Sequence, residues 1–508
     1  MAARCNNLTI QANHHSAVIA IGRAAAAPVG PPAYVSDCWR MAISLLTSLR
    51  LLRLRQLADP RNDRIATEVS LRGLCAFVVL KNIFARLPCL QNTTMSHVTH
   101  LICSTCNRRF SPVEIDYTCP DCGPIRGTLA VEYDYDAVRR ELSREALARN
   151  REATHWRYRA LLPVERPEFI QPLAVGWTPL YRNDFFRDQL GIGAVWIKDD
   201  SRNPTASLKD RASSVGVVKA LEKGTTAVTA ASTGNAASSL SAFTALAGLP
   251  TYIFVPEDAP RAKLVQLLLF GAHVIKVRGT YDDAFDLCWQ AAEKWGWYNR
   301  STAVNPYLGE GKKTAALEIC EQLGWQAPDY VFVPVGDGCI FQGMWKGFQD
   351  AHRLGWIERL PKMIGVQAEG SAALARAWER GAETAEPVEA VTFADSISVG
   401  LPRDQVKALR AARESGGAFV RVSDEEIAAA LALLARHAGI MAEPAGATGL
   451  AGLRKMAEQG RLRASDTAVV MVTGHGLKDI DGVKRAIHRE AIVVEKALED
   501  VEEKIAHL

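Results

Sequence analysis

The chain has no long apolar run. Among its 508 residues, no segment reaches eighteen consecutive apolar residues, which is the length that a membrane-spanning helix needs. The longest apolar stretches, near residues 41–52 and 74–80, are interrupted or flanked by Arg or Lys. We therefore expect no membrane span.

A strong excess of one charge is also missing. The formal net charge is +4, and residues 1–94 hold eleven Lys or Arg against four Asp or Glu, which leaves 49 basic and 52 acidic residues in the rest. Binding to a nucleic-acid backbone requires a concentrated basic face. The slightly acidic body argues against nucleic acid as the main partner.

A disulfide framework is absent as well. Four of the eleven cysteines form two Cys-x-x-Cys pairs, and the other seven are scattered. In a chain with 48% hydrophobic and 23% charged residues, this pattern is typical of a soluble protein in a reducing compartment with one metal site. We expect a cytoplasmic location.

The first 94 residues differ from the rest. They combine an Ala/Pro/Gly stretch at residues 24–32 with an Arg-rich stretch at residues 50–64, and they show no consistent helical or strand period. We interpret them as an N-terminal extension outside the fold, with Met95 as the working start. The alternative is a transit peptide, which would place the protein in an organelle.

Two cysteine turns follow this extension. The pairs Cys103-Ser-Thr-Cys106 and Cys119-Pro-Asp-Cys122 are twelve residues apart, and each turn directs two thiolates toward one point. Four such thiolates complete a tetrahedral shell, so the spacing predicts a structural zinc site. Unmetallated or redox-active cysteines are the alternative.

Apolar runs alternate with helical stretches from about residue 175 onward. This alternation predicts a parallel, doubly wound α/β sheet, whose ligands bind beyond the carboxyl ends of the strands. Helices are expected at residues 261–270 and 424–438, and a charged connecting helix at residues 136–159. Buried strands are expected at residues 227–231, 251–255, 273–277, 330–335, 363–368 and 467–472.

One lysine stands in an unusual setting. In Asn203-Pro-Thr-Ala-Ser-Leu-Lys-Asp-Arg211, the Asn-Pro-Thr turn precedes a helix that Ser207 could cap near Leu208. Lys209 would then lie in the first helical turn, where the helix dipole disfavours its protonated form. A lysine with a lowered pKa is a Schiff-base nucleophile.

Three further turns follow predicted strands. Ser232, Thr233, Gly234 and Asn235 combine hydroxyls, an amide and backbone N–H groups at a helix start, which suits a carboxylate, although a capped helix would need only one of these side chains. A glycine-containing turn after residue 335 suits a phosphate. Its residues are Gly336, Asp337, Gly338, Cys339 and Ile340. A last turn, Thr473-Gly-His-Gly476, offers a hydroxyl at a strand end.

Together these motifs resemble threonine synthase, a member of the tryptophan-synthase-β-like enzymes of fold type II that depend on pyridoxal 5'-phosphate. The resemblance is carried by the lysine segment, the Ser-Thr-Gly-Asn turn, Glu443-Pro-Ala-Gly-Ala447 and Thr473-Gly-His-Gly-Leu-Lys-Asp479. It covers roughly residues 95–490, and a four-cysteine knuckle also precedes the core in some relatives.

The resemblance implies a role for each motif. Lys209 would hold the cofactor and move protons, and residues 336–340 would bind its phosphate. Asn235 would bond the ring hydroxyl, Thr473 would face the ring nitrogen, and residues 232–235 would bind the substrate carboxylate. The implied reaction converts O-phospho-L-homoserine and water to L-threonine and phosphate.

Three positions depart from the family pattern. Asn305-Pro-Tyr-Leu308-Gly-Glu-Gly311 has Leu308 where an Arg is usual, and Lys312 and Lys313 are candidates to replace its charge on a helix beginning near Gly311. Ala206 stands where Gly is common, and the phosphate turn is not the usual Gly-Asn-x-Gly-Asn. Leu308 leaves open a related enzyme doing β-replacement or elimination on another amino acid. A non-catalytic zinc-knuckle binding protein is a more remote alternative.

The resulting domain scheme has a zinc knuckle ahead of a fold type II core made of two doubly wound α/β domains. The partner is a small amino-acid substrate, and a homodimer is one of the oligomeric states left open. The boundaries are 1–94 for the extension, 95–135 for the knuckle, 136–174 for a helical connector, 175–490 for the core with a smaller subdomain at about 215–325, and 491–508 for a C-terminal helix.

Overall fold

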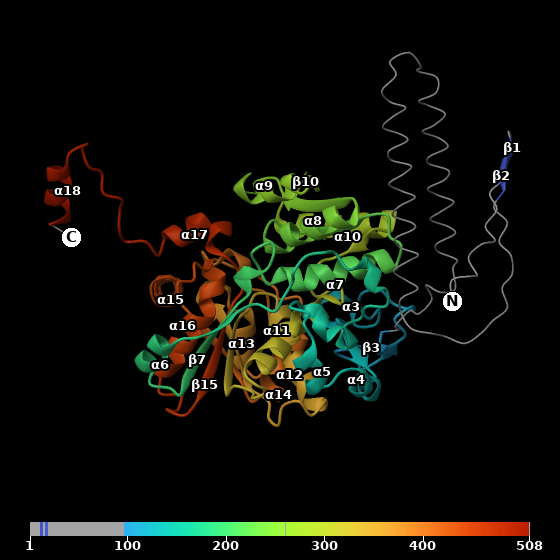
Figure 1. The fold of residues 1–508 in the computed structure, drawn as a ribbon, viewed down its shortest axis with the longest axis horizontal. Coiled ribbons are helices and arrows are strands. Elements are labelled where there is room, and N and C mark those ends of the chain that lie inside the picture. The colour runs from blue at the N-terminus through green and yellow to red at the C-terminus, as the bar shows by residue number, and fades with distance from the viewer. Residues whose placement is uncertain (1–10, 14–15, 19–95, 260, 507–508) are drawn as a thin grey trace, which may run out of the picture. The chain divides into compact units, whose positions relative to one another are not determined.

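The computed structural model describes residues 11–13, 16–18, 96–259 and 261–506, and the chain forms two units, Met1–Asn92 and Thr93–Leu508 (Figure 1). In the first unit, β1 (Gln11–Asn13) pairs antiparallel with β2 (Ser16–Val18). The other residues of the predicted extension lie outside the described part of the chain.

The second unit begins with a small antiparallel sheet. Its strands are β3 (Val98–Cys103), β4 (Arg109–Phe110) and β5 (Leu129–Tyr133), in the order β4-β3-β5. A short helix, α3 (Gly123–Arg126), lies between β4 and β5. This sheet carries the first Cys-x-x-Cys turn at the end of β3.

The connector is not the single helix expected for residues 136–159. It divides into three short helices because Asp134, Ser143 and Thr154 each cap a new helix start with a side-chain oxygen. These helices are α4 (Tyr135–Glu141), α5 (Arg144–Arg149) and the 3-10 helix η2 (His155–Leu161). A further 3-10 turn, η3, follows at Pro167–Phe169.

A six-stranded sheet forms the larger domain, in the order β14-β13-β12-β15-β7-β6. All neighbours are parallel except β6, which runs antiparallel to β7. The strands are β6 (Leu180–Arg182), β7 (Ala194–Asp199), β12 (Tyr330–Pro334), β13 (Lys362–Ala368), β14 (Ala418–Val422) and β15 (Thr467–Val472).

Helices cover both faces of this sheet, as the doubly wound prediction requires. Along β12, Val331 and Val333 point into one core with α11 and α12, whereas Phe332 points into a second core with α15 and α16. This alternation is the period of two that a strand buried on both faces must have. The helices are α6 (Asp184–Leu190), α11 (Leu308–Gln322), α12 (Cys339–Arg353), α13 (Ala373–Glu379), α14 (Gln405–Glu414), α15 (Asp424–Ala438) and α16 (Pro444–Glu458).

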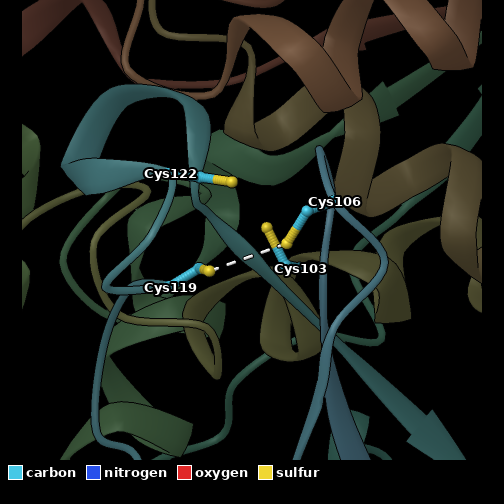
Figure 2. Close-up of side chains that lie close together, drawn as sticks. All are labelled: Cys103, Cys106, Cys119 and Cys122. Carbon is cyan, nitrogen blue, oxygen red and sulfur yellow. Dashed lines mark hydrogen bonds between the residues drawn. The ribbon is translucent and has the colours of Figure 1, made fainter.

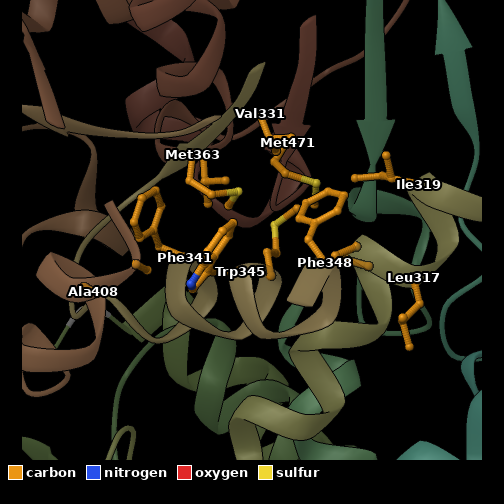
Figure 3. Packing of buried hydrophobic residues seen from close by; sticks show 14 of the residues in the cluster. Leu317, Ile319, Val331, Phe341, Trp345, Phe348, Met363, Ala408 and Met471 are labelled. Atoms are coloured by element: carbon orange, nitrogen blue, oxygen red, sulfur yellow. The ribbon is translucent and has the colours of Figure 1, made fainter. Parts of the chain in front are cut away.

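Helix α12 shows how this packing is achieved (Figure 3). Phe341, Trp345 and Phe348 recur at helical spacing and lie on one face of α12, toward Met363 of β13 and Met471 of β15. Burying each aromatic side chain contributes about 1.5–3 kcal/mol. This face therefore anchors α12 to the sheet and fixes where its N-terminus lies.

The smaller domain is a four-stranded parallel sheet in the order β10-β9-β8-β11. Its strands are β8 (Val228–Ala231), β9 (Thr251–Pro256), β10 (His273–Val277) and β11 (Tyr298–Asn299). Its helices are α7 (Lys209–Glu222), α8 (Asn235–Ala247), α9 (Arg261–Leu269) and α10 (Tyr281–Trp295), which Figure 1 shows gathered around the sheet.

Short elements complete the described chain. The 3-10 turns are η4 (Asp200–Arg202), η5 (Glu369–Ser371), η6 (Asp395–Ile397) and η7 (Gly476–Lys478), and the last helices are α17 (Ile480–Lys484) and α18 (Leu498–Ile505). Among the described residues, no helix combines the length and the apolar character needed to cross a membrane.

Candidate active site

A cavity of about 1050 Å³ lies where the carboxyl ends of strands from both sheets meet. Residues that follow β8, β11, β12 and β15 line it, including Ser232, Arg300, Val335 and Thr473. Parallel α/β sheets bind their ligands at this edge, because the loops and helix N-termini converge there. The cavity therefore has the position of an active site.

Lys209 lines this cavity at the first residue of α7. The backbone N–H of Leu208 donates to the carbonyl of Thr473 at 2.9 Å, and the N–H of His475 donates to the carbonyl of Ala206 at 3.0 Å. These bonds join the turn before Lys209 to the turn after β15. They bring Lys209 and Thr473, which are far apart in the sequence, to one wall of the cavity.

The Lys209 amine has a lowered pKa. Burial and the nearby cations Lys312 and Arg300 together lower it from 10.5 to about 8, against the opposing charges of Glu443 and Asp337. Ser207, however, does not cap α7 as expected: the residue before the helix is Leu208, and no side chain caps this helix start. The backbone closes this helix start instead, since the N–H groups of Asp210 and Arg211 donate to the carbonyls of Ser207 and Leu208 at 3.3 and 3.1 Å.

A buried ion network fixes the start of α7 to the large domain. Arg211 bonds Asp200 at 2.7 Å and Glu318 of α11 at 2.7 Å, and Glu318 also accepts from Lys198 at 2.7 Å. All four side chains are fully buried. Breaking such a network leaves an uncompensated buried charge, which is strongly destabilising. Lys198 and Arg211 thus position Lys209 without reaching the cavity.

The glycine-containing turn after β12 forms the N-terminus of α12. Gly338 has φ +94°, and a Cβ there would lie 2.7 Å from the Cβ of Ala408. No side chain caps this helix start, and Asp337 is tied to the neighbouring loop: the Asp404 amide donates to its carbonyl, and the Arg403 amide donates to its carboxylate. The helix dipole and the free amides make this turn an anion cradle. Asp337, Cys339 and Ile340 also line the cavity.

The Ser-Thr-Gly-Asn turn lies at the start of α8. All four residues, Ser232 to Asn235, line the cavity, and α8 likewise begins without a side-chain cap. The Asn235 amide donates to the Glu443 carboxylate at 2.9 Å. The expected bond from Asn235 to a ring hydroxyl stays a prediction.

Glu443 is a cavity residue that the sequence analysis quoted as part of a motif without assigning it a site role. It precedes α16, is almost fully buried and lines the cavity. Burial raises the pKa of its carboxyl, while Asn235 and Lys209 oppose that shift. A Cβ at Gly474 would lie 2.4 Å from a Glu443 carboxylate oxygen, so the glycine there makes room for Glu443.

The two candidate lysines on α11 point in different directions. Helix α11 begins at Leu308 and not near Gly311, so both lysines lie in its second turn. Lys312 lines the cavity. Lys313 does not line it, because its ammonium pairs with Glu310 at 2.6 Å and with Asp350 of α12 at 2.7 Å. The proposed substrate role of Lys313 is therefore not compatible with its position.

Ion pairs connect the two domains at the rim of the cavity. Lys263 of α9 pairs with Asp395 at 2.8 Å, and Arg403 pairs with Asp282 of α10 at 3.2 Å. Each pair joins the smaller domain to a loop of the larger one, and all four residues line the cavity. Because these pairs are partly exposed, each contributes at most about 1 kcal/mol to holding the rim together.

The four predicted metal ligands form a separate cluster in the N-terminal sheet (Figure 2). The Sγ atoms of Cys103, Cys106, Cys119 and Cys122 lie within 4.8 Å of one another, and Cys106 and Cys119 are 3.8 Å apart. Zn–S bonds of about 2.3 Å in a tetrahedron place sulfurs about 3.8 Å apart. The cluster therefore has the dimensions of a four-cysteine zinc site.

The comparisons with known proteins agree with this geometry. A family model described as pyridoxal-phosphate dependent enzyme matches residues 172–474. Threonine synthase of Methanocaldococcus jannaschii is 42% identical over 386 residues, which is 76% of this chain and 94% of that protein. The chain belongs to the threonine synthase family of pyridoxal-phosphate-dependent enzymes.

Other members of the threonine synthase family have similar sequence identity to this chain. The Methanosarcina acetivorans threonine synthase is 41% identical over 75% of this chain and 92% of its own length. That of Mycobacterium tuberculosis strain H37Rv is 39% identical over 64% of this chain and 88% of its own length.

Solved structures share the fold at much lower identity. Holo diaminopropionate ammonia lyase from Escherichia coli matches with TM-score 0.54 and 17% identity, covering 74% of this chain and 94% of that one. Threonine deaminase isoform 2 from Solanum lycopersicum matches with TM-score 0.52 and 21% identity, covering 63% and 87%. These structures show the fold alone, and the predicted fold type II architecture is confirmed.

Proposed function

We propose that this chain is a pyridoxal-phosphate-dependent lyase that converts O-phospho-L-homoserine and water into L-threonine and phosphate. The observation that carries the proposal is the similarity to threonine synthases along nearly their whole length, with Lys209 at the wall of the cavity. Leu308, in place of the usual Arg, leaves open a related enzyme with a different substrate. Leu308 is buried beside α7 and does not line the cavity, so it leaves the cavity wall to other side chains.

The residues present fit the cofactor. A phosphorylated aldehyde needs an amine that is neutral near pH 8 and an anion cradle without side chains in the way. Lys209 provides the amine, and the uncapped α12 turn with Gly336 and Gly338 provides the cradle. Thr473 would place a hydroxyl at the ring nitrogen. When bound, the cofactor supplies an electron sink for the charge left on the substrate Cα.

The residues of this chain would then bind and orient the substrate. The α8 turn at Ser232 to Asn235 would hold the carboxylate with backbone amides and hydroxyls. Once the substrate amine has displaced it, Lys209 Nζ would take one proton from Cα and one from Cβ, after which the Cγ–O bond breaks and phosphate leaves. One proton is then delivered to Cγ, which becomes the methyl group, and one returns to Cα. Water then adds its oxygen at Cβ, so that one phosphate leaves for each water consumed.

Glu443 is placed to support this chemistry. Its carboxylate holds the Asn235 amide and lies within electrostatic range of Lys209. We propose that Glu443 fixes the α8 turn in its binding position, because it joins α16 of the large domain to α8 of the small one.

A substrate panel tests the proposed function. Purified enzyme is incubated with O-phospho-L-homoserine, L-serine and L-threonine, and phosphate, L-threonine and keto acids are quantified. We expect equimolar phosphate and L-threonine from the first substrate and little keto acid from the others. Lys209→Ala should fold but show neither turnover nor cofactor that borohydride can fix to the chain. Keto acid as the main product would contradict the proposal.

We also propose that the four-cysteine cluster binds a structural Zn²⁺. Support comes from the mutual distances of the four thiols and from a donor set that leaves no open coordination position. The cluster lies in a core that includes Val215 and Val218 of α7 and Tyr307 before α11. A metal there would stabilise the base on which Lys209 and Lys312 are mounted. A cytoplasmic location and a homodimer stay predictions.

A further inference from the structure

Among the described residues, three cations line the cavity without forming a salt bridge, and two of them are buried. Lys209, Arg300 and Lys312 all line it, and Arg300 and Lys312 are each 1% exposed. Within the described part of the chain, none of the three forms a salt bridge, although thirty-one other pairs within 4.0 Å do so, among them the buried Lys313.

A buried charge is costly unless it is paired. The charges of Asp337 and Glu443 act on Lys209, and that of Asp337 also acts on Lys312, but neither acid forms a salt bridge with Arg300 or Lys312. The position of Arg300 and Lys312 therefore favours an anion from outside the chain.

Arg300 is the cation that the sequence analysis missed. It directly follows β11, and its backbone N–H donates to the carbonyl of Thr229 in β8 at 2.8 Å, so it stands at the carboxyl edge of the small sheet. Its guanidinium donates to Ser213 at 3.0 Å, one helical turn after Lys209 on α7. Its Nε is buried and has no acceptor among the described residues.

Arg300 also lies beside the residue that departs from the family pattern. A Cβ built on Gly216 of α7 would meet Leu308 Cδ2 at 3.0 Å and Arg300 Cγ at 3.9 Å. Leu308 thus packs on α7 next to the aliphatic part of Arg300, and Arg300 lines the cavity whereas Leu308 does not. The charge of Arg300 acts on both Lys209 and Lys312. The positive charge in this region therefore comes from the residue after β11, while the usual Arg position at the start of α11 holds an apolar side chain.

Two of the anions expected in this cavity already have binding sites of their own. The cofactor phosphate has its own cradle in the backbone amides of the α12 turn. The substrate carboxylate has the α8 turn. We propose that Arg300 and Lys312 form a further anion subsite, which takes the side-chain phosphate of the substrate. This inference rests on the proposed function for the identity of the anion.

The geometry favours a phosphate over a carboxylate in this subsite. A guanidinium with an unused Nε and an ammonium from a second element present donors from two directions, which suits a tetrahedral dianion. Asp337, the acid that lines the same part of the cavity, accepts from the Arg403 backbone amide at 3.1 Å and is thereby tied to the neighbouring loop. The subsite thus binds a leaving group, and it determines which substrates react.

The test compares three holoenzyme variants. Arg300→Gln removes the charge, Arg300→Lys keeps a charge without the planar fork, and Arg403→Gln removes a rim cation that already pairs with Asp282. Circular dichroism and bound cofactor are measured first. Then KM and kcat for O-phospho-L-homoserine, the affinity for inorganic phosphate by calorimetry, and the affinity for L-threonine by cofactor absorbance are determined.

We expect Arg300→Gln to keep its cofactor and to bind inorganic phosphate and O-phospho-L-homoserine roughly ten- to a hundredfold more weakly. L-threonine, which has no phosphate, should bind within about threefold of wild type, because its contacts are with the α8 turn. The phosphate affinity of Arg300→Lys should lie between those of wild type and Arg300→Gln. Arg403→Gln should change phosphate affinity by less than about threefold, as removal of a partly exposed pair does.

Two results would overturn the inference. One is unchanged phosphate affinity in folded, cofactor-loaded Arg300→Gln. The other is loss of cofactor from Arg300→Gln and Arg300→Lys alike, which would assign Arg300 to the cofactor phosphate. A wild-type enzyme that binds phosphate through Arg300 but does not turn over O-phospho-L-homoserine would support the subsite and refute the proposed function. Normal turnover with an unaltered KM in Arg300→Gln would support the proposed function and refute the subsite.

Discussion

The chemistry of Lys209 depends on its surroundings more than on its identity. Most lysines in a first helical turn are solvated and keep a pKa near 10.5. Here burial, Lys312 and Arg300 together lower the pKa to about 8. Each of these influences acts against the protonated form, so they add up.

The pH dependence of cofactor capture follows from this shift. Only the neutral amine reacts with an aldehyde, and a lowered pKa makes the neutral form dominant above about 8 instead of above 10.5. The rate at which apoenzyme captures the cofactor, followed by absorbance, should rise with pH through about 8 and then level off. A rate that keeps rising beyond pH 10 would show that Lys209 has an ordinary pKa.

The two adjacent lysines of α11 should respond oppositely to truncation. Lys312→Ala should raise the KM for O-phospho-L-homoserine roughly ten- to a hundredfold with little effect on Tm, because it removes a cavity cation. Lys313→Ala should leave KM nearly unchanged and destabilise the fold by roughly 3 kcal/mol. The reason is that Glu310 and Asp350 would keep Lys346 as their one remaining salt-bridge partner among the described residues.

Kinetics measured well below Tm, together with thermal melts of both variants, separate these effects. Equal and small changes in KM from both variants would mean that the phosphate is held by other residues.

Ala206 occupies a strained position next to the catalytic lysine. Its φ is +61°, in the left-handed region that costs an L-residue roughly 1–2 kcal/mol. Glycine relieves this strain but adds about 0.4–1 kcal/mol of unfolded-state entropy. Ala206→Gly should therefore stabilise the fold by about 0.5–1 kcal/mol in a thermal melt. Ala212→Gly, inside α7, is the control and should destabilise it by a similar amount.

At the scale of elements, helix N-termini organise the cavity. Helices α7, α8, α12 and α16 each begin at its wall, and none of these starts has a side-chain cap. Their positive dipole ends point at the same space. The cavity is therefore suited to a cofactor and a substrate that together carry two phosphates and one carboxylate.

The α12 turn should be sensitive to a single methyl group. Gly338→Ala adds a Cβ at φ +94° and 2.7 Å from Ala408 Cβ, so the turn must shift and its amides lose alignment. We expect cofactor affinity to fall at least tenfold, measured by titration of apoenzyme. Gly355→Ala, just beyond the other end of α12, is the control: its φ is +74°, but the added Cβ has open space. Retained cofactor affinity in Gly338→Ala would exclude this turn as the phosphate cradle.

At the scale of the whole molecule, the cysteine sheet is part of the same packed unit as the catalytic core. Arg410 of α14 donates to the Ser104 carbonyl, and the Tyr133 hydroxyl donates to Glu310 of α11 at 2.8 Å. The sheet also shares a hydrophobic core with α7. It therefore supports the elements that carry Lys209 and Lys312 without contributing to the cavity wall.

Loss of the metal should consequently reduce stability more than catalysis. Purified protein should contain about one zinc per chain, and Cys103→Ser combined with Cys119→Ser should lose it and melt at lower temperature. Activity assayed below the lowered Tm should fall less, because a closed four-cysteine site takes no part in chemistry. Cys320→Ser, buried on α11 away from the cluster, should keep its zinc. Wild-type protein without metal would refute the zinc site.

The sequence alone determined the features that depend on local order. Strands β10 and β15 were predicted with their observed bounds, because continuous apolar runs between turns are a local pattern. Strand β7 was missed because its run ends in Lys198 and Asp199, which look like surface residues until Glu318 is seen to neutralise Lys198. The lysine turn, the glycine turn and the cysteine spacing are also local patterns. In the structure Lys209 and the glycine turn line the cavity, and the four cysteines form one cluster.

Tertiary structure decided the rest. Whether Lys312 or Lys313 faces the cavity depends on the rotation of α11, which is set by its packing against α7 and α12. Arg300 and Glu443 enter the cavity wall only because β11 lies beside β8 and α16 begins opposite α8. Local sequence fixes which groups can react, but the cost of burying an unpaired charge depends on residues hundreds of positions away. The partners of these charges are therefore visible only in the folded chain.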